Sequence, residues 1–229
     1  MSYTEDIAQV QATMRWVSEV DPYPEEFVMH GLTWSSLPGV FPSTITSGTE
    51  VFSHIVCPDP GETFCEVGCG SGVISVMAAM QGKAQVTALD INPAAIDNCR
   101  VNAERHNVTH RMTCLVSDLF SEVPPSSSFD TIFWNVPWGL AEPSYQYVND
   151  LERAVFDPGY SLQRRYMTEG RAFLRDGGQQ LLGTTDIGDI ELLNSIAAEA
   201  DLKLQEVARV RRIEVNQLMT YIVYRVDEG

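Results

Sequence analysis

From residue 49 onward, hydrophobic and polar positions alternate between two spacings. Short apolar runs bounded by turn residues predict strands, and stretches with apolar residues three or four positions apart predict helices between them. The predicted strands are Thr63 to Val67, Gln85 to Asp90, Met112 to Ser117, Thr131 to Asn135, Gln179 to Gly183, Lys203 to Arg212 and Met219 to Val226. Strands that alternate with helices build a parallel sheet, and the last two strands, joined by a short polar stretch, predict a terminal antiparallel pair.

Local signals mark two boundaries within this region. Asn92 is a typical N-cap and Pro93 a typical first helical residue, which predicts a helix that runs to about His106. The run Asp176-Gly177-Gly178 predicts a turn before the fifth strand. We therefore expect an α/β protein of Rossmann-like architecture, with a seven-stranded, mostly parallel sheet and helices on both faces.

The residues before the sheet, 1–48, have a different pattern. A capping-box spacing followed by apolar residues at helical intervals predicts an amphipathic helix from about Thr4 to Glu19. Phe27 to Trp34 is apolar enough for a strand or a hairpin arm, and Leu37 to Thr49 has the composition of an ordered loop. We expect this extension to form a lid on the main domain, residues 49–229.

Charge restricts the classes of partner. The chain of 229 residues carries 31 acidic and 15 basic side chains, a formal net charge of −16 that repels phosphate backbones. Basic residues cluster only at Arg164-Arg165 and at Arg209, Arg211 and Arg212, and a solvated face is the favoured interpretation of both clusters. Nucleic acid is therefore disfavoured as a partner.

Composition also bears on compartment and metals. No stretch has the length and apolarity of a signal peptide or a membrane span, so we expect a cytoplasmic protein without membrane contact. The five cysteines form no C-x-x-C pair and have no histidines at zinc-ligand spacing, so we expect reduced core residues and no metal. The oligomeric state stays open between monomer and homodimer.

The most informative motif is Glu66-Val67-Gly68-Cys69-Gly70-Ser71-Gly72, between the first strand of the sheet and an apolar helix. Its glycines let backbone amides approach a ligand, and the helix that follows presents its positive end. A dinucleotide fingerprint would need a glycine at Val73, so the spacing points away from NAD. With its opening acidic residue, the run resembles the first motif of class I methyltransferases, which bind S-adenosylmethionine (SAM) and release S-adenosylhomocysteine (SAH).

The ends of successive parallel strands should converge on this ligand. Asp90 can accept hydrogen bonds from both ribose hydroxyls, and Ile91 follows it at the same edge. In Ser117-Asp118-Leu119, the Asp118 carboxylate can accept a hydrogen bond from the adenine amino group, while the apolar neighbour Leu119 covers the ring. Glu66 is a candidate partner for the cationic methionine portion. Alternatively, Asp90 belongs to a helix entry, Asp118 to a solvated turn, and Glu66 binds amides of the glycine loop.

A second motif, Phe133-Trp134-Asn135-Val136-Pro137-Trp138, ends the fourth strand where the methyl group should emerge. A planar nitrogen is a poor nucleophile until hydrogen bonding draws its lone pair toward the methyl donor. The Asn135 side-chain oxygen and the Val136 carbonyl can accept the two amino hydrogens, while Trp138 stacks on the acceptor plane. Transfer is then a single in-line displacement that depends on positioning. The alternative is a structural turn with a buried tryptophan.

Asn135 to Trp138 resembles the Asn-Pro-Pro-Tyr motif of amino-methylating class I enzymes, which include adenine methyltransferases and the HemK-type enzymes that methylate release-factor glutamine. The run Ala88 to Pro93, the run Ser117 to Phe120 and Phe156-Asp157-Pro158-Gly159 resemble the HemK-type group over roughly residues 40 to 185. Within it, Thr49-Glu50 matches the family's entry to the cofactor site. The resemblance thus implies Asn135, Pro137 and Trp138 as catalytic residues and places Thr49, Cys69 and Ile91 at the cofactor.

Two departures limit the transfer of a substrate. Val136 replaces the first proline and Trp138 replaces tyrosine, and the extension is too short for the helical substrate domain usual in release-factor enzymes. The expected function is SAM-dependent methylation of a nitrogen in a small molecule, a short peptide or a protein glutamine. The alternatives are adenine-N methylation of RNA or DNA, O- or C-methylation of a metabolite, and a non-catalytic SAM-binding subunit. Trp34, Phe41, Tyr145 and Tyr147 are candidates to roof the acceptor pocket.

Overall fold

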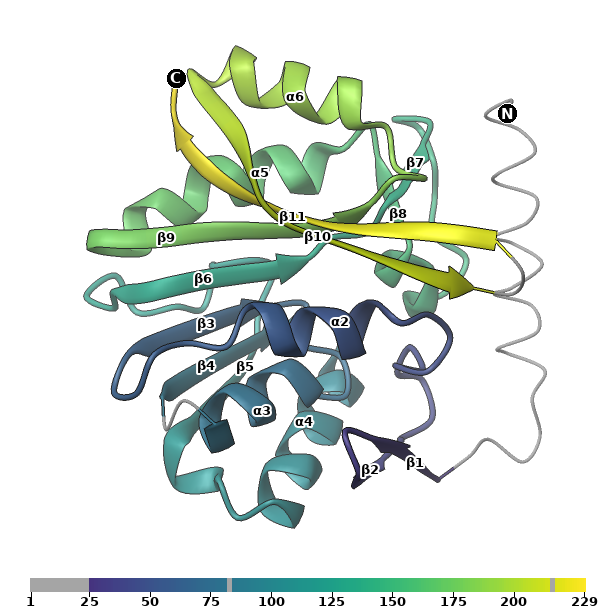
Figure 1. Cartoon of the computed structure of the whole chain (residues 1–229), viewed down its shortest axis with the longest axis vertical. Helices are drawn as coiled ribbons and strands as arrows, with labels where there is room; N and C mark the ends of the chain where they lie inside the picture. Colours follow the sequence, from purple (N-terminus) through teal and green to yellow (C-terminus); the bar gives the residue numbers. More distant parts are fainter. Residues whose placement is uncertain (1–24, 82–83, 215–216) are drawn as a thin grey trace.

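The computed structural model describes residues 25–81, 84–214 and 217–229. The helix predicted from Thr4 to Glu19 lies outside the described residues, and so does Asn216 in the polar stretch between the last two strands. A seven-stranded sheet forms the centre of the molecule (Figure 1), in the order β10-β11-β9-β6-β3-β4-β5. Its strands are β3 (Thr63–Val67), β4 (Gln85–Asp90), β5 (Met112–Val116), β6 (Phe129–Asn135), β9 (Leu174–Thr185), β10 (Leu202–Glu214) and β11 (Gln217–Glu228).

The pairing confirms the predicted topology. The pairs among β5, β4, β3, β6 and β9 are all parallel, while β11 is antiparallel to both β9 and β10. The seven strands correspond one to one with the seven predicted from hydrophobic spacing. The prediction of a terminal antiparallel pair is therefore confirmed, and the second strand of the pair lies between β9 and the edge strand β10.

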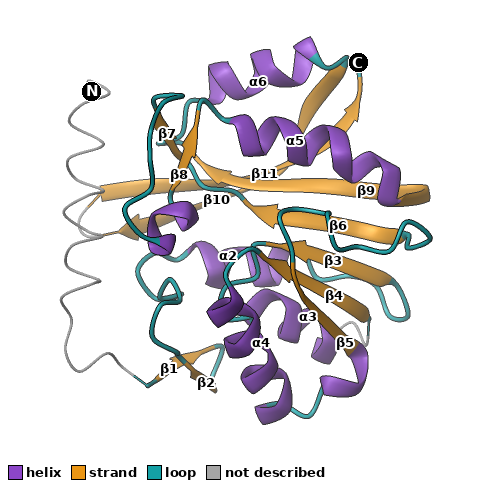
Figure 2. Cartoon of the chain, turned by 180° about the vertical axis from the view of Figure 1, so that it is seen from behind, coloured by secondary structure: helices purple, strands orange, loops and turns teal. Residues whose placement is uncertain are grey.

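Helices cover both faces of the sheet (Figure 2). Helices α2 (Gly48–Ile55), α3 (Val73–Gln81) and α4 (Pro93–Arg105) cover one face, and α5 (Ser161–Glu169) and α6 (Ile190–Glu199) cover the other. In the part of the chain that the structure describes, the connections also contain three short 3-10 helices: η1 (Thr109–Arg111), η2 (Asp150–Ala154) and η3 (Gly170–Phe173). Strand β6 illustrates the two cores, since Phe133 packs toward α2 and α3 whereas Ile132 and Trp134 pack toward α5 and α6.

Helix α4 begins as predicted. The Asn92 side chain accepts a hydrogen bond from the amide of Ala94 at 2.9 Å, and Pro93 is the first helical residue. The predicted turn at Asp176-Gly177-Gly178 is wrong in its placement. Strand β9 starts earlier, at Leu174, and its pairing with β6 jumps from Leu174 to Gln179. The glycines therefore form a bulge inside one strand, where Gly177 has a φ of +77°.

The described part of the extension starts with an antiparallel hairpin of β1 (Glu26–Met29) and β2 (Leu32–Ser35), so the predicted Phe27 to Trp34 element has two arms. Buried asparagines of α4 hold the chain that follows. Asn102 accepts from the Ser35 amide at 2.7 Å, and Asn98 accepts from the Leu37 amide at 2.9 Å. The extension is thus joined to the sheet through the helix that follows β4.

Two features of the sheet's carboxyl edge were not predicted. A parallel pair, β7 (Gly139–Ala141) and β8 (Phe156–Pro158), follows the Asn135 motif. The β10–β11 ribbon extends beyond the end of β9, because β11 pairs with β9 only from Tyr221 onward. In this projecting part, the Glu214 carboxylate accepts from the Ser47 amide at 2.8 Å and from the Tyr221 hydroxyl at 2.6 Å.

All five cysteines are free, as expected. Cys65, Cys69 and Cys99 are buried and Cys114 is partly buried, but Cys57 is exposed, so the prediction that all are core residues is wrong for Cys57. Among the described residues, no helix combines the length and apolarity needed to cross a membrane. No group of three or more His, Cys, Asp or Glu side chains placed to hold a metal ion occurs in the same part of the chain.

Candidate active site

The glycine motif forms the turn between β3 and α3, and its three glycines have different roles. All three have positive φ, at +63°, +54° and +81° for Gly68, Gly70 and Gly72. A Cβ on Gly68 would lie 2.7 Å from Trp134 Nε1, and one on Gly72 would lie 2.6 Å from Cys99 Sγ. A Cβ on Gly70 would meet nothing within 4 Å. Close packing therefore requires the outer two glycines, and of the three only Gly70 faces open space. Contact of a ligand with the main chain of all three stays a prediction.

Asp90, at the end of β4, lies beside this open position. One carboxylate oxygen accepts from the Gly70 amide at 2.9 Å, and the other accepts from the Asn92 amide at 2.9 Å. Burial raises the pKa of Asp90 while these amides oppose the rise. Asp90 thus serves the helix entry as well as the glycine loop, and each oxygen keeps a lone pair for a further donor.

Ser117, Asp118 and Leu119 form a tight turn after β5. The Ser117 hydroxyl donates to the Leu119 carbonyl at 2.8 Å, and Leu119 has a φ of +48°, a strained conformation for a non-glycine residue. Leu119 is only 5% exposed and packs into the core on the α5 side. Apolar side chains that do face solvent at this edge are Ile91, which is 45% exposed, and Val116 at the end of β5, which is 44% exposed.

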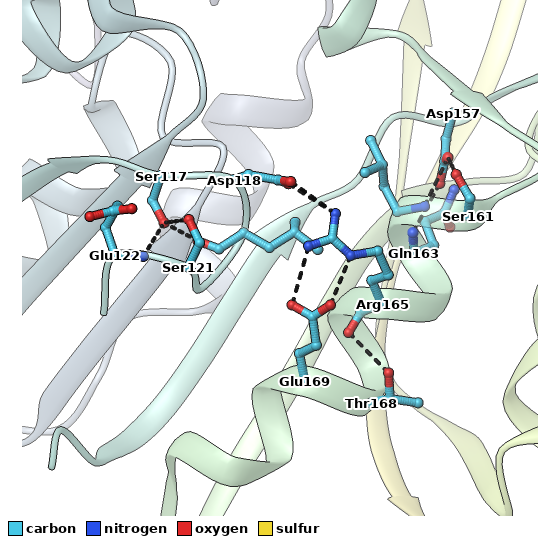
Figure 3. A network of polar contacts seen from close by, with 12 residues as sticks. Ser117, Asp118, Ser121, Glu122, Asp157, Ser161, Gln163, Arg165, Thr168 and Glu169 are labelled. Atoms are coloured by element: carbon cyan, nitrogen blue, oxygen red, sulfur yellow. Dashed lines mark hydrogen bonds and ion pairs between the residues drawn. The ribbon is translucent and has the colours of Figure 1, made fainter. Parts of the chain in front are cut away.

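The Asp118 carboxylate is about half exposed and forms an ion pair that sequence analysis did not find (Figure 3). Arg165 Nη1 lies 3.0 and 3.1 Å from its two oxygens. Arg165 comes from α5 and also binds Glu169, one turn further along the same helix. Asp118 is therefore more than the solvated turn residue that the alternative interpretation expected.

Two predicted cofactor residues have buried side chains. Glu66 is 2% exposed and accepts a hydrogen bond from the Ser75 hydroxyl on α3. Burial raises the pKa of Glu66 to about 8. Cys69 is 6% exposed and packs with Ala88, Ile96 and Cys99, so only its main chain can line the loop.

Asn135 ends β6 with its side chain toward the α2 face. A Cβ on Gly48, the first residue of α2, would lie 3.6 Å from Asn135 Nδ2 and 3.4 Å from the Tyr221 ring. Within the described residues, the Asn135 side-chain amide has no hydrogen-bond partner. The start of α2, which carries the predicted residue Thr49, thus lies against the Asn135 motif.

Two of the main-chain carbonyls that follow Asn135 accept hydrogen bonds from α5 and the turn before it, and one does not. The Pro137 carbonyl accepts from Gln163 Nε2 at 2.9 Å, and the Trp138 carbonyl accepts from the Tyr160 hydroxyl at 2.7 Å. The Val136 amide donates to the Gly183 carbonyl at 2.9 Å, whereas the Val136 carbonyl has no partner in the described part of the chain. The two open acceptors are therefore the ones that the sequence analysis selected, Asn135 and Val136.

The candidate roof aromatics separate into two groups. Trp34 is fully buried, donates to the Met29 carbonyl at 3.0 Å and packs on His106, so it is a core residue and not part of a pocket. The other three candidates, Phe41, Tyr145 and Tyr147, are partly buried and share one cluster with Trp138 beside β7 and β8. Phe41 belongs to the extension, so this cluster joins the extension to the Asn135 motif.

Several residues of the site were missed because their role depends on tertiary contacts. Gln163 and Tyr160 fix the acceptor loop from α5 and the turn before it, and Asp157 fixes the start of α5 by accepting from the amides of Leu162 and Gln163. The only sequence signal for them was Phe156-Asp157-Pro158-Gly159 ahead of a helix. Nothing in the local sequence indicated that Arg165 reaches Asp118.

Known proteins resemble part of this chain. A release factor glutamine methyltransferase from Rhodopirellula baltica is 33% identical over 133 residues, which cover 54% of this chain and 44% of the relative. A protein from Methanocaldococcus jannaschii, provisionally named a protein N5-glutamine methyltransferase, is 28% identical over 165 residues, covering 70% of this chain and 80% of the relative. The chain thus spans less than half of the release factor enzyme's length.

The fold and the sequence family agree. A solved methyltransferase from Pyrococcus furiosus superposes with a TM-score of 0.61 at 18% identity, covering 95% of this chain and 98% of the other, which shows a shared fold. Residues 31–150 match the methyltransferase small domain family, and they include the glycine loop, Asp90, Asp118 and the Asn135 motif. Since this match covers more than half of the chain, the protein belongs to the methyltransferase small domain family.

Proposed function

We propose that this protein is a SAM-dependent methyltransferase that methylates a planar nitrogen, with the side-chain amide of a glutamine in a protein or peptide as the leading acceptor. The observation that carries the proposal is the pair of open acceptors at the end of β6. The Pro137 and Trp138 carbonyls are engaged by α5 and its preceding turn, whereas the Asn135 and Val136 oxygens have no hydrogen-bond partner among the described residues.

The residues at the carboxyl edge of β3, β4 and β5 fit the cofactor. The open space at Gly70 leaves room for a ligand at the positive end of α3. Asp90 keeps lone pairs for ribose hydroxyls, and the exposed Asp118 carboxylate suits the adenine amino group. Ile91 offers an exposed apolar side chain to the base. When bound, SAM supplies a methyl carbon made electrophilic by its sulfonium.

The chain's own contribution to the reaction is to orient and activate the acceptor. A primary amide has two N–H donors and a delocalised lone pair. If the Asn135 oxygen and the Val136 carbonyl each accept one N–H, the lone pair is drawn out of the amide plane toward the donor. We assign Trp138 to the flat surface beside the acceptor, and Pro137 to the rigidity of the loop.

The extension completes this site in our proposal. Ser43 Oγ and Ser71 Oγ lie 2.7 Å apart, which ties the segment before α2 to the glycine loop. Gly48 brings the start of α2 against Asn135. We assign the part of the extension that the structure describes to one wall of the acceptor pocket, and Thr49 to the cofactor side of that wall.

A protein or peptide acceptor is favoured over nucleic acid by charge and by the names of relatives. Three of the five arginines in the two basic clusters form internal ion pairs: Arg164 with Glu199, Arg165 with Asp118 and Glu169, and Arg209 with Glu206. A net charge of −16 repels a polyanion overall. Relatives from two organisms carry glutamine methyltransferase names.

Calorimetry and mass spectrometry test the proposal. We expect heat of binding with SAH, and with SAM a mass gain of one methyl group on peptides containing glutamine but not on matched peptides containing glutamate. Asn135→Ala should keep the SAH affinity and lose most of the turnover, because the lost oxygen acts on the acceptor alone. Methylation of a nucleic acid, or of an oxygen or carbon in a metabolite, would refute the glutamine acceptor. Binding without any transfer would indicate a cofactor-binding subunit.

A further inference from the structure

We propose that Arg165 is a positioning residue that sets the selectivity of the cofactor site for adenine, by holding the Asp118 carboxylate at the edge of that site. The inference rests on the proposed SAM site and adds to it a residue of α5, the helix on the sheet face opposite to α3 and α4. Arg165 does not touch the cofactor in this proposal and acts only through Asp118.

The geometry of the guanidinium carries the proposal (Figure 3). Nη1 lies 3.0 and 3.1 Å from the two oxygens of Asp118, while Nε donates to Glu169 at 2.8 Å. A planar guanidinium has donors in fixed directions, so binding Glu169 on one side fixes where the Nη1 donor points. Glu169 therefore orients Arg165, and Arg165 orients Asp118.

The support for Arg165 is rigid. Helix α5 begins at Ser161, and the Asp157 carboxylate accepts from its Leu162 and Gln163 amides at 3.0 and 2.9 Å. Tyr166, the neighbour of Arg165, is fully buried and donates to the Leu181 carbonyl at 2.6 Å. A fixed helix thus places the guanidinium, whereas an Asp118 side chain that is about half exposed would otherwise rotate freely.

Held in this way, Asp118 discriminates between bases. An ionised carboxylate only accepts hydrogen bonds, so it favours the adenine 6-amino group and disfavours a 6-oxo group at the same place. Arg165 contacts both oxygens through a single nitrogen, which leaves lone pairs for the amino group. Removing Arg165 should therefore weaken adenine binding and leave the binding of a 6-oxo base nearly unchanged.

The chain supplies a matched control. Arg164, the preceding residue on α5, pairs with Glu199 of α6 at 2.6 Å and is exposed to a similar extent, 43% against 40% for Arg165. Arg164→Gln removes the same charge from the same helix without touching Asp118. A general effect of charge or of helix stability would appear in both variants.

The experiment measures the dissociation constants of SAH and of its 6-oxo analogue, S-inosylhomocysteine, by calorimetry on the full chain. Wild-type protein should prefer SAH. Arg165→Gln should lower that preference by about two- to fivefold, the range that an exposed ion pair supports. Asp118→Asn, whose amide can donate to the 6-oxo group, should lower the preference further. Arg164→Gln should leave it at the wild-type value.

Each result decides the matter. An unchanged preference in Arg165→Gln, or equal weakening of both ligands, would overturn the positioning role. Tighter SAH binding in Arg165→Gln would mean that Arg165 competes with adenine for Asp118, which also refutes it. If wild-type protein binds neither ligand, the proposed SAM site itself fails. That outcome is distinct, because the wild-type measurement is independent of Arg165.

Discussion

Alanine substitutions of two glycines in the β3–α3 turn should separate stability from ligand binding. At Gly72 a Cβ would lie 2.6 Å from Cys99 Sγ and 2.8 Å from Cys99 Cα, a backbone atom that cannot move aside cheaply. At Gly70 the added Cβ would point into open space. Both residues have positive φ, so both substitutions carry backbone strain, but only Gly72→Ala also overpacks the core.

The magnitudes follow from these contacts. A Cβ in the left-handed region costs roughly 1–2 kcal/mol. Overpacking adds about 1–3 kcal/mol, so Gly72→Ala should lose about 2–5 kcal/mol of unfolding free energy. For a domain of this size, that loss corresponds to a decrease in Tm of about 4–20 °C. Gly70→Ala should lose only about 1–2 kcal/mol and should bind SAH at least about tenfold more weakly, because its methyl group occupies the cradle.

Urea unfolding and calorimetry with SAH measure the two effects, and Gly61→Ala is the control. Gly61 has a φ of +93° with nothing near its Cβ position, so this variant reports strain alone. If Gly72→Ala is no less stable than Gly61→Ala, the assigned contact with Cys99 is wrong. If Gly70→Ala binds SAH as wild type does, the ligand does not approach the turn at Gly70.

Three further predictions concern buried polar groups. Gln163→Ala leaves the Pro137 carbonyl without its buried partner, so unfolding free energy should fall by about 1–3 kcal/mol and methyl transfer should fall more than SAH affinity; equal losses would contradict the loop-holding role. Asn102→Ala removes the bonds to Ser35 and to the Ser71 carbonyl, so urea unfolding should show a loss of about 2–5 kcal/mol, and a loss below this range would mean that the extension is held elsewhere. Burial raises the pKa of Glu66 from an ordinary value of 4.5 to about 8. Between these pH values the folded protein binds more protons than the unfolded chain, so stability should decrease as pH rises from about 4.5 to 8. Glu66→Gln should flatten this pH dependence in unfolding experiments, and an unchanged slope would refute the assignment.

The sheet could be predicted from the sequence because its signals are local. Each strand is a short apolar run, and Asn92-Pro93 marks the start of α4 without help from the rest of the fold. The turn predicted at Gly177 is instead a bulge inside β9, because a pair of glycines is compatible both with a turn between strands and with a bulge inside one. The β7–β8 pair was missed because strands of three residues leave no periodicity to detect.

In the candidate site, too, local sequence signals pointed to some residues, whereas tertiary contacts decide the place of the others. Asp90, Asp118 and Asn135 were selected because each lies at or next to the end of a predicted strand, and strand ends converge at one edge. Their roles stay predictions. Trp34 was offered for the pocket because an aromatic side chain gives no local sign of which way it faces, and the fold buries it completely. Arg165 and Gln163 were missed because their partners, Asp118 and Pro137, are 47 and 26 residues away in the sequence. These contacts depend on where the fold places α5.

The position of β11 bears on how the chain acquires its structure during synthesis. Strand β11 is synthesised after the other six strands of the sheet, yet it takes an interior place between β9 and β10. Until it emerges, β9 is an unprotected edge and β10 has no neighbour, while β3, β4 and β5 can already assemble around the glycine turn. Tyr221 and the strand pairing that places Glu214 arrive with β11, so the start of α2 is anchored only after β11 has been made. A nascent chain would therefore order the glycine turn and β3, β4 and β5 before the region where α2 meets Asn135, and deletion of β11 would affect that region first.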